Sequence, residues 1–428
     1  MDLLTESMAN TCLNDGPEEL EQLLFRPQAG SGIAKTVLDD IPRYLFRVAS
    51  PNSDGNTNET WVRSDSSYRN KASSMEDIFF NLGAEKRTKI AQILNLHLRW
   101  WPKHGAEDNF VSWTSSLLFA IQYIYYRHLS PKDGSGLPEI RLYVIDTTRF
   151  PRGTFIRDLD LINIFCESDE NLKYLQSLRN RPSYYFGEYL SQGALKIENK
   201  CQMIPAEILF EQNRLRRLQP HFAQLHRETR RGKPEWVKEV IRLRKTIWPD
   251  TGLPIFSLAE MWDRLQAVEE IIQNIAPGWR LPLAIYFAAL IGSESNIEEQ
   301  ETANDNVFFA YFRSKSFHLD LRGPERFRSS NFNVAAPDST PELKQVKKIL
   351  REIHKHSQLK WALERVSEAE VSIRTLHVQN VFSENGHAFI AADSNKMLAR
   401  TGQAVLSKLG TVAMLCKEVA LAISSEEA

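Results

Sequence analysis

The chain has 428 residues, of which 42% are hydrophobic and 25% charged, so it can bury an ordinary core and needs no metal or disulfide to fold. A formal net charge of −1 excludes a global field that would draw it to nucleic acid or to a membrane surface. The four cysteines are scattered and none lies in a CxxC motif, which excludes a zinc ribbon and is typical of a reducing compartment.

The beginning of the chain and its longest apolar run bear on localisation. Residues 1–38 are mostly polar, and we expect a flexible tail or docking segment; the first residues lack the basic and then apolar pattern of a secretory signal. The longest apolar run, residues 281–291, contains Pro282 and is shorter than the roughly 20 residues that span a bilayer. We therefore expect an intracellular protein, cytoplasmic or nuclear, with no membrane contact.

Residues 39–212 predict a mixed α+β domain. A segment rich in β-formers at 41–48 is followed by turn formers at 51–56, which indicates a strand and a loop. Apolar residues fill one face of residues 84–101 and Pro102 follows, which predicts a helix. Further predicted elements are a strand at 110–115, a buried helix at 116–126, a central strand at 140–146, a helix at 170–180, and closing strands at 188–190 and 194–209.

Residues 213–428 predict a mainly helical C-terminal region. It contains a helix at 257–275, an acidic loop at 294–306, a long amphipathic helix after Pro341 and a final helix at about 395–423. The two apolar stripes are Leu343, Val346, Ile349, Leu350 and Ile353, and Leu398, Val405, Leu409, Val412 and Cys416. Exposed stripes of this kind predict that a protein partner docks on the C-terminal helices.

A basic segment at 214–245 holds eleven Lys or Arg residues against three glutamates. Such a segment can contact the phosphates of a nucleic acid, which is one interpretation of it. No regular aromatic interleaving supports stacking of single-stranded bases. A solvated helix face explains the same composition, and we favour that interpretation.

Several catalytic motifs are absent from the sequence. It contains no HExxH, no GxSxG nucleophile elbow and no glycine-rich phosphate loop. His354 and His356 are two residues apart, so a helix points them to different faces, and His97, His104 and His128 have no acidic partner at ligand spacing. We therefore expect no metal site and no serine hydrolase, and we interpret the histidines as structural.

The remaining constellation lies within the α+β domain. Arg47 sits on the first strand, residues 112–115 form a Ser-Trp-Thr-Ser strand end before an aromatic helix, and Glu188 sits on a late strand. This order resembles the arginine–serine–glutamate pattern of ADP-ribosyltransferases. The wider run from Tyr44 to Gly193 also resembles an uncharacterised fungal domain family. The resemblance implies a split β-sheet and NAD as the substrate.

The chemistry of NAD cleavage explains these residue types. Breaking the nicotinamide–ribose bond builds positive charge on the sugar, which a carboxylate stabilises, so Glu188 is the candidate catalytic residue. Arg47 is placed to hold a phosphate in a planar, bidentate way. The resemblance implies that Ser112, Thr114 and Ser115 hold the ribose and the glutamate, while Phe119 or Tyr123 packs on the nicotinamide ring.

Two departures of this sequence from the transferase pattern keep an alternative function open. Many transferases of this class carry Glu or Gln two residues before the catalytic glutamate, where this chain has Phe186, which disfavours transfer to arginine. Glu207 and Glu211 are rival glutamates nearby. The alternative is a catalytically inactive transferase-like protein that serves as an interaction module, associated with nucleic acid if the segment 214–245 binds phosphates.

Overall fold

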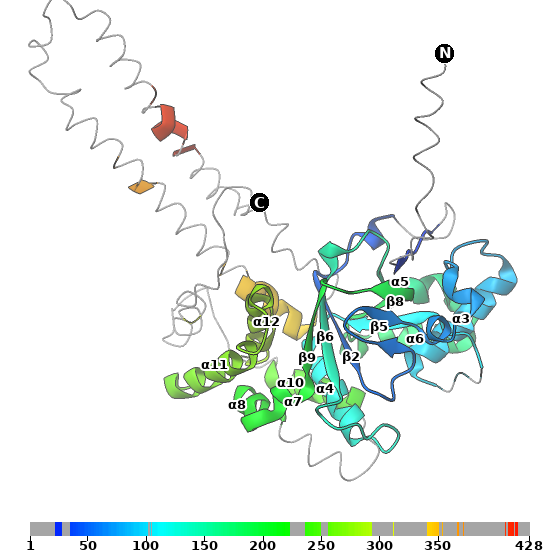
Figure 1. Ribbon diagram of the computed structural model, residues 1–428, viewed down its shortest axis with the longest axis horizontal. Helices are drawn as coiled ribbons and strands as arrows, with labels where there is room; N and C mark the ends of the chain where they lie inside the picture. Colours follow the sequence, from blue (N-terminus) through cyan, green and yellow to red (C-terminus); the bar gives the residue numbers. More distant parts are fainter. Residues whose placement is uncertain are drawn as a thin grey trace, which may run out of the picture. The chain divides into compact units, whose positions relative to one another are not determined.

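The computed structural model describes residues 22–27, 35–101, 103, 105–222, 236–249, 256–292 and 340–350, together with a few isolated residues (Figure 1). The chain divides into two compact units, Met1–Ser295 with Val334–Val346 and Asn296–Asn333 with Lys347–Ala428. The described residues of the second unit are few and helical. The acidic loop expected at 294–306 and most of the helix expected at 395–423 lie outside the described residues.

An antiparallel, curled β-sheet forms the centre of the first unit (Figure 1). Its strands follow the spatial order β3-β4-β8-β5-β2-β6-β9. The strand bounds are Gln22–Leu23 (β1), Tyr44–Ala49 (β2), Asn56–Thr57 (β3), Trp61–Arg63 (β4), Phe110–Thr114 (β5), Arg141–Asp146 (β6), Ile156–Arg157 (β7), Glu188–Lys196 (β8) and Cys201–Pro205 (β9). Because β1, β4, β5 and β7 all pair with β8, this strand organises one half of the sheet.

The helices of the first unit pack against this sheet and against one another. Their bounds are Asp65–Tyr68 (α2), Ala84–Arg99 (α3), Leu117–Leu129 (α4), Asp158–Phe165 (α5), Glu170–Arg179 (α6), Ala206–Phe210 (α7), Arg214–Leu218 (α8), Trp236–Ile247 (α10), Leu258–Ile272 (α11) and Pro277–Ala289 (α12). Short 3-10 turns lie at Lys35–Leu38, Ala72–Met75, Thr147–Arg149, Cys166–Ser168, Pro182–Tyr184 and Glu211–Asn213. No helix in the described part of the chain is long and apolar enough to cross a membrane.

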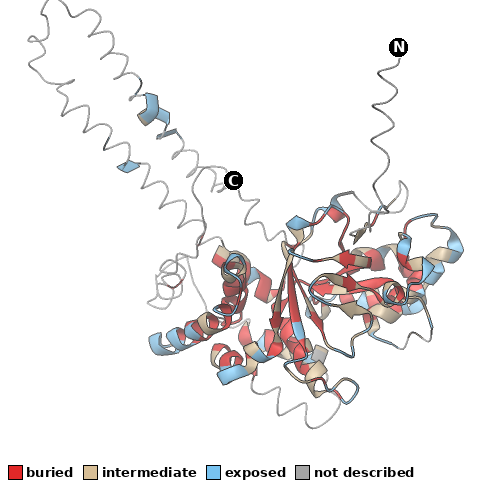
Figure 2. Ribbon diagram, in the orientation of Figure 1, coloured by how far each residue is buried: buried red, intermediate tan, exposed pale blue. Residues whose placement is uncertain are grey.

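Two apolar clusters hold the sheet and its helices together (Figure 2). One joins α3, α5 and α6 to β5 and β8 and includes Leu94, Phe165 and Leu190. The other lies on the opposite face of the sheet and is centred on Trp113 and Tyr189, which are almost fully buried. Burying the sheet on both faces fixes the register of its strands, because a slip of one residue would exchange the two faces.

The sheet is split between β2 and β5. β2 pairs with β6 along its whole length, and β5 pairs with β8 along its whole length, but β2 and β5 share one residue pair, Phe46 with Thr114. Continued register would bring Val48 opposite Ser112, and that pair is not formed. The two halves of the sheet therefore diverge beside Ser112 and leave room for a hollow.

The α+β class predicted from the sequence is confirmed, but one detail of the prediction is wrong. Residues 194–209 are not one closing strand: β8 continues to Lys196, β9 ends at Pro205, and Ala206–Phe210 is helical. Pro205 precedes the first helical residue, where it fixes an extended backbone. Within the segment expected to be a flexible tail or a docking segment, Gln22–Leu23 pairs with β8 and the side chain of Phe25 is buried.

The helices after residue 212 belong to the same compact unit as the sheet, so the boundary expected there does not separate two units. Within the basic segment, residues 223–235 lie outside the described residues. Four of its described arginines form ion pairs with carboxylates: Arg214 with Glu211, Arg217 with Asp263, Arg242 with Glu239, and Arg244 with Glu342. Much of the described positive charge is thus already neutralised.

A buried ion pair anchors residues 340–346 behind the sheet. Glu342 and Arg244 lie 2.6 Å apart, and their side chains are only 3% and 6% exposed. Glu342 also accepts a hydrogen bond from Ser116, the residue that caps the N-terminus of α4, and Arg244 donates to the carbonyl of Tyr185. The pair therefore ties α10 and the segment after Thr340 to the end of β5 and the approach to β8.

Removing one partner of this pair leaves an uncompensated buried charge, which typically costs about 3–5 kcal/mol. We expect Glu342→Gln to lower the free energy of unfolding by about that amount in guanidinium denaturation followed by tryptophan fluorescence. The matched control is Glu167→Gln, because Glu167 forms an exposed pair with Lys173. An equal loss of stability in both variants would contradict an anchoring role for Glu342.

Candidate functional site

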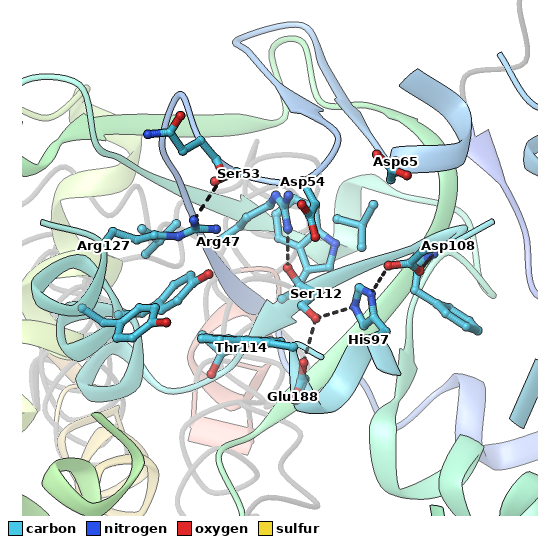
Figure 3. Close-up of a pocket in the computed structure, with 18 of the residues that line it drawn as sticks. Arg47, Ser53, Asp54, Asp65, His97, Asp108, Ser112, Thr114, Arg127 and Glu188 are labelled. Carbon is cyan, nitrogen blue, oxygen red and sulfur yellow. Dashed lines mark hydrogen bonds and ion pairs between the residues drawn. The ribbon is translucent and has the colours of Figure 1, made fainter. Parts of the chain in front are cut away.

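A cleft of about 300 Å³ opens where the sheet splits (Figure 3). β2 and β5 supply its floor, α3 and α4 supply its walls, and the segment after β2 covers its rim. The residues used below that line it are Arg47, Asp54, His97, Trp100, Lys103, Asp108, Ser112, Thr114, Phe119, Tyr123, Arg127, Asp133 and Glu188. A hollow of this size is at the lower end of the range for small-molecule sites.

Strand register brings Ser112 and Glu188 together. Thr114 pairs with Glu188 and Ser112 pairs with Leu190, so the side chains of Ser112 and Glu188 share one face of the sheet. The Ser112 hydroxyl donates to Glu188 Oε1 at 2.7 Å. The other carboxylate oxygen, Oε2, accepts from Arg179 Nη2 at 2.7 Å, and both side chains of that pair are 8% exposed.

Arg47 bridges the opening between the two halves of the sheet. Its Nη1 donates to the carbonyl of Ser112 at 3.0 Å (Figure 3), and its Nε donates to the Thr57 hydroxyl at 3.1 Å. Burial lowers the pKa of Arg47 to about 10, so the guanidinium stays charged at neutral pH. Arg47 forms no ion pair with any carboxylate among the described residues.

Every carboxylate in the lining of the cleft has a basic partner. Asp133 pairs with Arg127, Asp54 and Asp108 both pair with Lys103, Asp65 pairs with Arg69, and Glu188 pairs with Arg179. Arg47 is the contrasting case, a partly buried cation that only neutral groups contact within the described chain. This asymmetry favours an anionic ligand beside Arg47.

The other serine and threonine of the predicted motif hold the backbone. The Thr114 hydroxyl donates to the carbonyl of Phe186 at 2.8 Å and accepts from the backbone of Ser116 at 3.0 Å. Ser115 is fully buried, lies outside the lining of the cleft, and donates from its backbone to the carbonyl of Gly187. Both residues therefore fix the approach to Glu188, and Ser112 is the hydroxyl of this motif that contacts the Glu188 side chain.

Aromatic side chains form one wall of the cleft. Phe119 packs on Phe186, with 5.2 Å between ring centroids, and Tyr123 lies 4.5 Å from the ring of Trp100. Trp100 follows α3 with φ of 53°, a left-handed conformation that favours glycine and strains a bulky residue. Its indole packs on Tyr123 and Tyr126 with the rings tilted by 48° and 47°, and these contacts hold an aromatic side chain at the mouth of the cleft.

His97 makes contacts that the sequence did not predict. His97 does have an acidic partner: its Nδ1 lies 2.7 Å from Asp108, and its Nε2 lies 2.8 Å from the Ser112 hydroxyl. The helix α3 carries His97, whereas Asp108 lies on the loop before β5, so their separation of eleven residues fits no ligand spacing within one element. The clearest sequence signal in this region is the alternation of Ser112 and Thr114 along one strand. That pattern gives no information about side chains on other elements, so it does not identify His97.

No group of three or more metal-ligating side chains occurs in the part of the chain that the structure describes. Asp108 instead contacts both His97 and Lys103. Burial alone would raise the pKa of this carboxyl, but the charges and hydrogen bonds of His97 and Lys103 outweigh it and lower the pKa to about 2. The three residues form a compact charged group at the end of α3.

Comparison with known families covers this part of the chain. Residues 40–198 match a domain of unknown function, DUF7587. The matched segment contains every residue that lines the cleft, so the cleft is a feature of that domain and not of the helices that follow it. An uncharacterised domain family was expected from the sequence, and this coarse expectation is confirmed. No curated protein and no solved structure matches the chain significantly.

The lowered pKa of Asp108 makes stability depend on pH in a defined window. An aspartate in the unfolded chain titrates near pH ~4, so the stabilisation is complete above that pH and is lost as pH falls toward 2. A shift of this size corresponds to about 2 kcal/mol. In urea unfolding across this range, Asp108→Asn should show a shallower loss of stability than wild type, while the exposed control Asp40→Asn retains the wild-type slope. Identical slopes for wild type and Asp108→Asn would contradict the assignment.

Proposed function

We propose that the cleft binds NAD and cleaves its nicotinamide–ribose bond, as an ADP-ribosyltransferase or an NAD glycohydrolase does. The observation that supports this most directly is the meeting of Arg47, Ser112 and Glu188 on the adjacent strands β2, β5 and β8. Residues far apart in the sequence reach one cleft in the strand order that the arginine–serine–glutamate resemblance implies. The split between β2 and β5 supports the same proposal, because it gives a ligand access to all three strands.

Each side chain has a role that its surroundings support. Arg47 is charged, partly buried and unpaired with any described carboxylate, which suits it to a phosphate of the dinucleotide. Glu188 presents Oε1 toward Ser112 in the lining of the cleft, and an ionised oxygen there stabilises the positive charge that develops on the ribose. Phe119 and Tyr123 offer apolar faces to the nicotinamide ring.

A second candidate function is nucleotide binding without cleavage. The observation that favours it is the buried ion pair between Arg179 and Glu188, because a neighbouring cation offsets the charge that catalysis would use. In this case Arg47 and the aromatic wall still hold the ligand, and the protein acts as an interaction module. The two candidates differ in one measurable respect: both bind NAD, and only the first releases nicotinamide.

Glu188→Gln separates the two candidates. If Glu188 stabilises the transition state, this substitution should reduce nicotinamide release by about 100-fold or more while NAD binding persists. Release is measured by chromatography and binding by calorimetry. Glu198→Gln is the matched control, because Glu198 is exposed just beyond the other end of β8. Binding without release by the wild-type protein would support the second candidate and exclude the first.

Arg47→Met tests the phosphate contact. We expect NAD to bind about 10- to 100-fold more weakly. The reason is that the variant lacks the guanidinium that contacts Ser112 and that forms no ion pair with a described carboxylate. The unfolding free energy should change little, since relief of a desolvated charge offsets the two lost hydrogen bonds. Arg141→Met, on an exposed side chain of β6, is the control. Undiminished NAD affinity in Arg47→Met would remove Arg47 from the binding site.

A further inference from the structure

A continuous chain of polar contacts runs from Asp108 through His97 and Ser112 to Glu188 (Figure 3), and Glu188 in turn contacts Arg179. Asp108 contacts His97 Nδ1 at 2.7 Å, and His97 Nε2 contacts the Ser112 hydroxyl at 2.8 Å. Ser112 then contacts Glu188 Oε1 at 2.7 Å, and Glu188 Oε2 contacts Arg179 at 2.7 Å. The serine hydroxyl therefore stands between an aspartate–histidine pair and a glutamate–arginine pair.

The first three residues have the spacing of a Ser-His-Asp triad, in which histidine takes the serine proton. The position of Glu188 argues against that activity. A carboxylate accepts hydrogen bonds and donates none, so the 2.7 Å contact with Glu188 uses the only proton of the Ser112 hydroxyl. No proton remains for Ser112 to give to His97. Protonating Glu188 would release it, but that would break the charge-assisted contact of Glu188 with the buried Arg179 guanidinium at 2.7 Å, closer than the other carboxylate beside Arg179, Asp158 at 3.6 Å.

Counting protons then fixes the state of the imidazole. The contact with the Asp108 carboxylate requires a hydrogen on Nδ1, and the contact with Ser112 requires a hydrogen on Nε2, because the hydroxyl proton points to Glu188. The Asp108 carboxylate beside the ring favours an imidazolium. Lys103 contacts the same oxygen of Asp108, Oδ2, at 2.6 Å, and it also pairs with Asp54. The ring of Phe110 packs 5.7 Å from the imidazole and restricts its rotation.

We propose that the Asp108–His97 pair is a positioning device in which a doubly protonated His97 holds the Ser112 hydroxyl on Glu188. The imidazole donates to the lone pair of Ser112 Oγ, which leaves the hydroxyl proton one acceptor, Glu188 Oε1. Ser112 in turn orients the oxygen of Glu188 that lines the cleft. His97 is thus not a general base, and Ser112 is not a nucleophile in the resting site. The effect of this arrangement on catalysis rests on the proposed cleavage of NAD. The protonation state of His97 does not depend on that proposal.

The protonation state can be measured directly. In protein labelled with ¹⁵N-histidine at about pH 7.5, where an ordinary imidazole is mostly neutral, both ring nitrogens of His97 should carry protons. The His97 signals are assigned by their loss in His97→Gln. In Glu188→Gln the amide can donate to Ser112, the hydroxyl can turn to His97, and Nε2 should lose its proton. A neutral His97 in the wild-type protein, or an unchanged His97 in Glu188→Gln, would overturn the proposal.

Two further measurements test the positioning role. A fluorophosphonate probe should leave Ser112 unlabelled in the wild-type protein, because no base takes its proton; labelling of Ser112 would show a nucleophilic serine and refute the proposal. If NAD is cleaved, His97→Asn, whose amide is too short to replace Nε2, should lower kcat about 10-fold or more with little change in KM. His97→Gln, whose amide reaches farther, should restore part of that loss. Equal kcat in wild type and His97→Asn would contradict positioning even if the NMR result agrees.

Discussion

One gap in the hydrogen-bond ladder determines where this protein can bind a ligand. β2 and β5 share a single residue pair, and beyond it the carbonyl of Ser112 would lack a strand partner. A buried carbonyl without a partner is costly, and the guanidinium of Arg47 supplies the missing donor at 3.0 Å. A side chain thus replaces a strand, which leaves the sheet open at this point. This opening in the sheet forms the cleft and places Arg47 and Ser112 in its lining.

The burial of Arg47 in the split sheet has an electrostatic cost, and this cost indicates which kind of ligand the cleft would bind. Arg47 loses much of its hydration in the split, and the lowering of its pKa from 12.5 to about 10 corresponds to about 3 kcal/mol of unfavourable free energy for the charged form. Each acid that lines the cleft pairs with another base, and Asp54 offsets the burial of Arg47 only in part, through its charge and without an ion pair. An anion that enters the cleft would relieve it. The same burial that destabilises the charged form of Arg47 therefore favours a phosphate-bearing ligand over a neutral one.

The sequence predicts the individual strands of this site better than the contacts between side chains on different elements. Alternating side chains placed Ser112 and Thr114 on a strand, and the β-formers around Arg47 identified β2, because both signals lie within a few residues. The contacts of Glu188 with Arg179, and of His97 with Asp108 and Ser112, join different elements. They depend on register and helix packing, which no local pattern encodes. The strand assigned to residues 206–209 failed for a related reason, since apolar residues there suit a short buried helix equally well.

Ser112 has two neighbours that compete for one proton, and this competition constrains what the cleft can do. A carboxylate on one side and an imidazole on the other cannot both receive the hydroxyl hydrogen. The ion pair with Arg179 keeps Glu188 an acceptor, so the imidazole must be the donor. A site built this way stabilises negative charge on Glu188 and removes nucleophilic character from Ser112. Cleavage that relies on an ionised acid is compatible with such a site, whereas acyl transfer through the serine is not. The ion pair that weakens Glu188 as a charge partner is thus also what fixes its oxygen in place.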